Sequence, residues 1–64
     1  MTKVKIYTNG RIYKAEAKGP TDIFYHWVKN NGSGYEFGSK NELMAYLDEI
    51  FHYEWEIEYA WRQI

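Results

Sequence analysis

The chain contains no cysteine, and this absence constrains its fold more than any other feature of the sequence. Neither a disulfide framework nor a thiolate metal site can stabilise it, although small secreted domains usually depend on one or the other. A chain of 64 residues buries only roughly 60% of its unfolded surface, so its stability must come from large apolar side chains. Three tryptophans, seven tyrosines and three phenylalanines supply them. We therefore expect one small domain, residues 1–64, with an aromatic-rich core.

Charge and hydropathy limit the compartment and the partners. The first ten residues hold no continuous apolar run and no stretch approaches membrane-spanning length, so we expect a cytoplasmic chain without a membrane partner.

Residues 1–40 carry seven Lys or Arg against three Asp or Glu, whereas residues 41–64 carry one against six. Each half is a candidate electrostatic footprint for a partner, unless the two halves neutralise each other in the fold.

The first eighteen residues predict a β-hairpin. Polar and apolar residues alternate over 3–8 and 11–18, and Asn9-Gly10 between them is typical of a two-residue type I′ turn. Thr8 then lies opposite Arg11, which aligns Ile6 with Tyr13 and Val4 with Ala15. One face is predicted to join the core: Val4, Ile6, Tyr13, Ala15 and Ala17. The other is predicted to face water: Lys3, Lys5, Tyr7, Lys14 and Lys18.

The middle of the chain is ambiguous between strand and helix. Gly19-Pro20-Thr21-Asp22 indicates a turn, and the β-branched and aromatic residues 23–28 favour a strand with both faces at least partly covered. A helix over 21–29, capped by Thr21-Asp22, is the alternative. A reversal at 30–34 is then expected to lead into a short strand, 35–37.

The last part of the chain predicts a helix and then, by preference, a strand. Ser39 followed by Glu42 has the form of a capping box, and Leu43, Tyr46, Leu47 and Ile50 recur at helical spacing, so we expect a helix from about 40 to 51. Tyr53, Trp55, Ile57, Tyr59 and Trp61 alternate with polar or small residues, which favours a strand over 53–61. Continuation of the helix is the alternative, because no turn residue separates 50 from 53.

Together these elements predict an α+β fold: a small antiparallel sheet, made of the N-terminal β-hairpin and two or three further strands, packed against one amphipathic helix. The aromatic residues of 53–61 are expected to complete the core. The same segment is also a candidate for pairing with its copy in a homodimer.

The sequence offers no constellation for catalysis, for a cofactor or for a metal. The histidines, His26 and His52, have no ligand spacing on one element, and Ser39 is better explained as a helix cap. Gly32-Ser33-Gly34 leads into a predicted strand rather than a helix, so it indicates a turn and not a phosphate loop. An enzyme would need a pocket that holds a histidine near carboxylates.

Two surfaces remain as candidate binding sites. The first is acidic and would dock on a basic protein surface. The alternatives are that its carboxylates pair internally with Lys3 and Lys5 or that they protect an edge strand. Its residues are Asp48, Glu49, Glu54, Glu56 and Glu58. The second is the basic hairpin face, where ammonium groups and one ring would bind nucleic acid: Lys3, Lys5, Tyr7, Lys14 and Lys18. The slightly acidic net charge disfavours the second.

The leading functional hypothesis is therefore a non-enzymatic protein-binding module that acts through its acidic, aromatic-rich C-terminal region. In size and segregated charge the chain is similar to small accessory proteins of phages and mobile elements, many of which inhibit host nucleases or defence proteins. That similarity, which rests on no defined motif, implies a stoichiometric inhibitor. Nucleic-acid binding through the basic hairpin face is the alternative.

Overall fold

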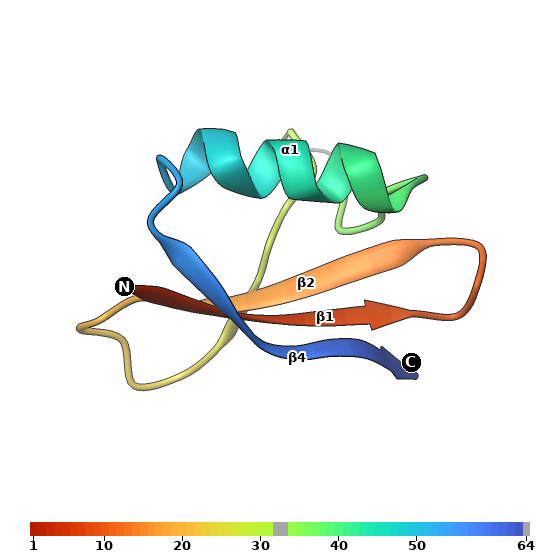
Figure 1. Ribbon diagram of the computed structural model, residues 1–64. Coiled ribbons are helices and arrows are strands. Elements are labelled where there is room, and N and C mark those ends of the chain that lie inside the picture. Colours follow the sequence, from red (N-terminus) through yellow and green to blue (C-terminus); the bar gives the residue numbers. More distant parts are fainter. Residues whose placement is uncertain (32–33, 64) are drawn as a thin grey trace.

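The computed structural model describes residues 1–31 and 34–63, with side chains as far as Glu58. In this part of the chain a four-stranded sheet is covered on one face by one helix (Figure 1). The elements follow in the order β1 (Thr2–Thr8), β2 (Tyr13–Lys18), β3 (His26–Trp27), α1 (Lys40–Ile50) and β4 (Trp55–Gln63). The strand order across the sheet is β3-β2-β1-β4. The predicted α+β class, with its N-terminal hairpin and its covering helix, is confirmed.

The hairpin of β1 and β2 forms with the predicted faces but not with the predicted turn. Thr8 pairs with Tyr13 rather than Arg11, so four residues, 9–12, form the loop. The side-chain oxygen of Asn9 accepts the backbone N–H groups of Arg11 and Ile12 at 2.9 and 3.1 Å. These bonds satisfy the loop backbone and favour the wider turn over the type I′ turn. Because the register moves by two residues, every side chain keeps its predicted face.

Strand β4 lies beside β1 and runs parallel to it, so the sheet is mixed rather than antiparallel as expected. Thr2 pairs with Trp55 and Val4 with Ile57. After α1 the chain returns to the start of β1 before β4 begins, which fixes the parallel direction (Figure 1). The prediction of a strand, rather than a continued helix, is confirmed.

The break between α1 and β4 comes from two residues that are not glycine. His52 and Tyr53 have positive φ angles of 53° and 64°, in the left-handed region. The N–H of Phe51 still bonds to the carbonyl of Leu47, and the N–H of Tyr53 bonds to the carbonyl of Asp48. This turn ends the helix without glycine, proline or asparagine, which is why the sequence shows no signal for it.

Helix α1 begins as its capping sequence predicts. The Ser39 hydroxyl accepts the backbone N–H of Glu42 at 3.1 Å. The Glu42 carboxylate accepts the N–H of Gly38 at 3.4 Å, one residue earlier than a capping box requires. Leu43 and Leu47 are buried on the sheet side, and Tyr46 and Ile50 pack at the edge of the core.

The segment between β2 and α1 is mostly irregular, which corrects both readings of 21–29. Within 21–29 only His26–Trp27 pairs with β2 as a strand, and neither a longer strand nor a helix forms. Ile23 and Phe24 are 81% and 72% exposed, so the expectation that both faces of 23–28 are covered is wrong for these two residues. The predicted strand 35–37 is reduced to one bridge between Phe37 and Tyr13. Gly32 and Ser33 of the predicted reversal lie outside the described residues.

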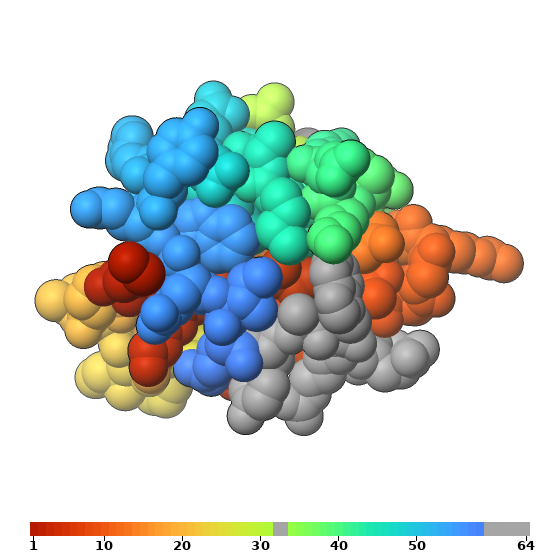
Figure 2. All heavy atoms as spheres, in the orientation of Figure 1, coloured from red at the N-terminus to blue at the C-terminus, as the bar shows by residue number. Residues whose placement is uncertain are grey.

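The core lies between α1 and the inner face of β1 and β2. Its buried members among the described side chains are Val4, Ile6, Ala15, Ala17, Val28, Phe37, Leu43 and Leu47. Figure 2 shows the helical residues, green to blue, closing the molecule over this layer. From β4 Trp55 packs against the core, whereas Ile57 is 45% exposed. Tyr59 and Trp61, which we expected to complete the core, lie outside the described side chains.

In the described chain no helix is long and apolar enough to cross a membrane.

Candidate binding face

The sheet face that points away from α1, here called the outer face, collects most of the predicted candidates. Val4, Ile6, Ala15 and Ala17 point to the core, so their neighbours along β1 and β2 point the opposite way. Paired residues share a face, so among the residues whose side chains are described the register adds Trp27 from β3 and Glu56 from β4. The outer face thus carries Lys3, Lys5, Tyr7, Lys14, Glu16, Lys18, Trp27 and Glu56, and Glu58 of β4 joins them through its contact with Lys5.

Tyr7 and Trp27 form the aromatic centre of the outer face. Their ring centroids are 5.4 Å apart and the ring planes are inclined by 53°, a favourable tilted arrangement. The Lys14 ammonium lies 5.6 Å from the centroid of the Trp27 ring. Trp27 is nevertheless 43% exposed, so the largest ring of this face is open to solvent.

Tyr25, just before β3, connects the edges of the outer face. Its hydroxyl donates to Glu58 Oε2 of β4 at 2.7 Å, across β2 and β1. The ammonium groups of Lys5 and Lys18 lie 4.0 and 5.2 Å from its ring centroid. Lys5 also lies 4.0 Å from Glu58. Tyr25 therefore links an acidic residue of the C-terminal half to two lysines of the N-terminal half.

A bulge in β4 accounts for the position of Glu58. The pairing of β1 with β4 shifts between Val4 and Lys5, so that Val4 pairs with Ile57 and Lys5 with Tyr59. Glu58 is the extra residue at this shift. Its carboxylate reaches both Lys5 and Tyr25 from there. The interpretation that the acidic strip pairs internally with the first strand holds for Glu58.

The five residues of the predicted acidic site do not gather on one surface. Glu56 and Glu58 lie on the outer face, and Glu54 is exposed just before β4, where its carbonyl accepts the Thr2 N–H. Asp48 and Glu49 belong to α1, in the opposite layer. Asp48 accepts a hydrogen bond from the Trp55 indole at 2.8 Å. The acidic candidates are thus divided between the two layers.

The five residues of the predicted basic site do share one face. Lys3, Lys5, Tyr7, Lys14 and Lys18 all lie on the outer face. Sequence reasoning missed three residues among them: Glu16, whose carboxylate accepts the Tyr7 hydroxyl, together with Tyr25 and Trp27. The two-residue spacing of Tyr25 and Trp27 is the signal that could have placed both rings on one side.

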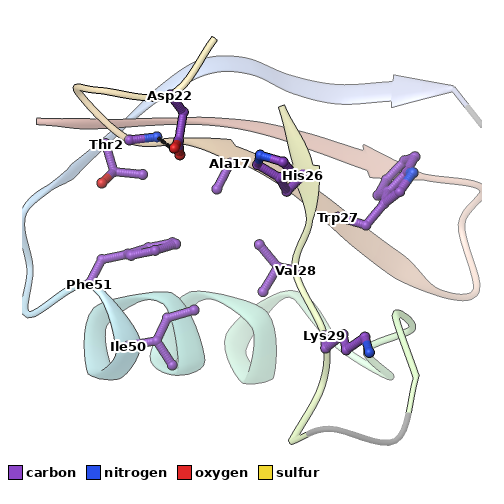
Figure 3. Close-up of a pocket in the computed structure, with 10 residues that line it drawn as sticks. Thr2, Ala17, Asp22, His26, Trp27, Val28, Lys29, Ile50 and Phe51 are labelled. Carbon is purple, nitrogen blue, oxygen red and sulfur yellow. Dashed lines mark hydrogen bonds between the residues drawn. The ribbon is translucent and has the colours of Figure 1, made fainter. Parts of the chain in front are cut away.

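A separate pocket of about 280 Å³ lies on the other side of the sheet, between α1 and the edge strand β3 (Figure 3). His26 and Asp22 both line it. Asp22 Oδ2 accepts the Gly19 N–H at 2.9 Å. In the described part of the chain the His26 imidazole makes no hydrogen bond to Asp22.

Within residues 1–31 and 34–63, no group of three or more His, Cys, Asp or Glu side chains lies close enough to hold a metal ion. His52 lies in the turn after α1 and is exposed.

Comparison of the chain with protein families, with curated proteins and with solved structures found no match.

Proposed function

We propose that this chain is a non-enzymatic module that binds a protein partner through the outer face of its sheet. The observation that carries the proposal is the exposed Trp27 ring, packed on Tyr7 and surrounded by charged groups of both signs. Tyrosine and tryptophan dominate the energetic centres of protein interfaces, and a polar rim commonly surrounds them. The outer face has this composition.

The mixed charge of the outer face favours a protein over a nucleic acid. Its lysines share the surface with Glu16, Glu56 and Glu58. A phosphate backbone would be repelled by these carboxylates, and the whole chain carries a net charge of −1. A protein surface can present charges of both signs around an apolar centre, so it can match the pattern. The partner we propose has an apolar centre flanked by acidic and basic groups.

The contacts of Tyr25 support a pre-organised face. The hydroxyl bond to Glu58 and the two lysines over the ring restrict this side chain before any partner arrives. Less side-chain entropy is then lost on binding, which increases affinity. A stoichiometric inhibitor that blocks a partner's surface is one form of this function.

The test is affinity capture from nuclease-treated lysate, comparing the wild-type chain with Trp27→Ala. Removal of the ring should weaken capture of a specific partner at least about tenfold, as expected when a central aromatic residue of an interface is lost. The matched control is Tyr53→Ala, because Tyr53 is 78% exposed in the turn after α1 and does not belong to the outer face. Circular dichroism would verify that both variants fold.

Loss of capture in Trp27→Ala, with retention in Tyr53→Ala, would support the outer face as the site. Equal capture by both variants would exclude it. Glu56→Lys tests the acidic contribution, since Glu56 lies on the outer face beside Lys3. Glu58 is less suitable because its replacement also breaks the bond to Tyr25.

Single-stranded nucleic acid is the second candidate, favoured by the lysine ammonium groups that lie against Tyr25 and Trp27. Binding of this kind would give an oligonucleotide shift that weakens steeply with salt. A salt-sensitive shift abolished by Trp27→Ala, together with no protein captured after nuclease treatment, would replace the protein-binding proposal with this one.

A further inference from the structure

The pocket between α1 and β3 is apolar on its inner walls. Ala17, Val28, Ile50 and Phe51 face one another there, with the sheet on one side and the helix on the other (Figure 3). An apolar cavity of roughly 150 Å³ already accommodates benzene, so a pocket of about 280 Å³ has room for a phenylalanine ring. The pocket is therefore suited to an apolar or aromatic side chain.

Two exposed apolar side chains, Ile23 and Phe24, here called the apolar projection, precede the pocket residues of β3 in the sequence. Ile23 and Phe24 are 81% and 72% exposed, and with Tyr53 they are the three most exposed of the large apolar side chains in the described part of the chain. They belong to the loop between β2 and β3, which leaves the sheet beside the N-terminus of β1 (Figure 1). Burying such side chains is favourable, so a surface that covers them is stabilised.

The exposed side chains of Ile23 and Phe24 are close in sequence to residues that line the pocket. Asp22 and His26, which flank Ile23 and Phe24, both line the pocket. Two copies related by a two-fold axis near this loop can therefore each insert Phe24 into the other's pocket, and both contacts form in one orientation. The lining also includes one acidic and one basic residue, Asp22 and Lys29, so the copies can place opposite charges together.

We propose that this chain forms a homodimer in which Phe24 of each copy occupies the apolar pocket of the other. This interface lies on the helix side and edge of the sheet, away from the C-terminal segment that sequence analysis favoured for self-association. Trp27 of the outer face also lines the pocket, but the proposal concerns self-association alone, and it is tested on the purified chain without any partner.

Sedimentation equilibrium over a wide concentration series tests the proposal. The wild-type chain should pass from monomer to dimer, and Phe24→Ala should weaken dimerisation at least about tenfold because a buried ring is lost. Ala17→Met should weaken it too, because the longer side chain enters the pocket from its wall. Tyr53→Ala, exposed in the turn after α1, should dimerise like the wild type.

Mixing the two variants is the decisive experiment. Phe24→Ala keeps an open pocket and Ala17→Met keeps the projecting ring, so an equimolar mixture restores one of the two contacts. We expect a heterodimer in the mixture at concentrations where each variant alone is monomeric. A wild-type chain that stays monomeric, a Phe24→Ala variant that dimerises normally, or a mixture of two folded variants without heterodimer would each overturn the proposal.

A second measurement does not depend on the folding of Ala17→Met. The methyl resonances of Val28 and Ile50, which line the pocket, should shift with concentration in the wild-type chain. They should not shift in Phe24→Ala. Concentration-independent resonances in the wild type would contradict the dimer. Because only purified protein is used, failure here leaves the proposed function of the outer face untouched.

Discussion

Trp55 connects the last strand to the helix through one hydrogen bond. Its indole N–H donates to Asp48 Oδ1 at 2.8 Å in a partly buried place, while its ring packs against the core. A hydrogen bond to a charged acceptor contributes more than a neutral one, and a buried carboxylate without its donor is costly. The indole therefore contributes a hydrogen bond to a charged acceptor as well as apolar packing.

We predict that Trp55→Phe lowers the free energy of unfolding by about 1 to 3 kcal/mol, because the Asp48 carboxylate loses its donor. Asp48→Asn keeps an oxygen acceptor and should cost less. Urea unfolding followed by circular dichroism measures both, and the double variant gives the coupling energy. Equal costs for the two single variants, without coupling, would contradict this role of the bond.

At the scale of elements, α1 shows how local sequence sets a boundary. Ser39 has extended backbone angles, φ −149° and ψ 159°, and its hydroxyl satisfies the Glu42 N–H. The other end is set by the positive φ angles of His52 and Tyr53. The start is therefore encoded by a residue type, whereas the end is imposed on residues that do not prefer it.

We predict that Ser39→Ala destabilises the chain by about 1 kcal/mol, since one backbone N–H of the first turn loses its acceptor. Ser39→Asp is the matched control, because aspartate caps as well as serine and should leave stability nearly unchanged. Urea unfolding measures the difference, and hydrogen exchange at the Glu42 amide locates it. If the alanine and aspartate variants are equally stable, the cap is not stabilising.

At the scale of the whole molecule, Phe37 holds the irregular segment to the sheet. It is fully buried, its ring lies 5.5 Å from that of Tyr46, and its backbone exchanges two hydrogen bonds with Tyr13, each 2.8 Å long. One residue thus fixes the chain between β3 and α1 to both layers.

We predict that Phe37→Ala costs roughly 3 to 5 kcal/mol, the usual range for a buried phenylalanine. That loss is comparable to the whole free energy of unfolding of a chain this short, roughly 3 to 10 kcal/mol. Tyr35→Ala is the control, because Tyr35 is exposed and its replacement should cost less than about 0.5 kcal/mol. A cooperative thermal transition retained in Phe37→Ala at wild-type temperature would contradict this assignment.

The arrangement of charge is also a property of the whole molecule. The basic N-terminal and acidic C-terminal halves meet on the outer face, where Lys5 lies beside Glu58 and Lys3 pairs in register with Glu56. The parallel pairing of β1 with β4 produces this meeting. Segregated charge along the sequence therefore becomes mixed charge on one surface, which is why neither predicted site persists as a surface of one sign.

Local patterns in the sequence determined the faces of the hairpin, the start of α1 and the strand character of the C-terminal segment. Each depends on side-chain periodicity or on a bond between near neighbours, so it can be read without knowing the fold. The same alternation placed Lys3, Lys5, Tyr7, Lys14 and Lys18 on one face.

Only the tertiary structure decided the parallel direction of β4, the shortness of β3 and the division of the acidic residues. Periodicity says which side a residue faces, but not which strand lies beside it or in which direction that strand runs. Tyr25 shows the difference, since its bond to Glu58 joins residues 33 positions apart. Such contacts depend on the path of the whole chain, and no local pattern encodes that path.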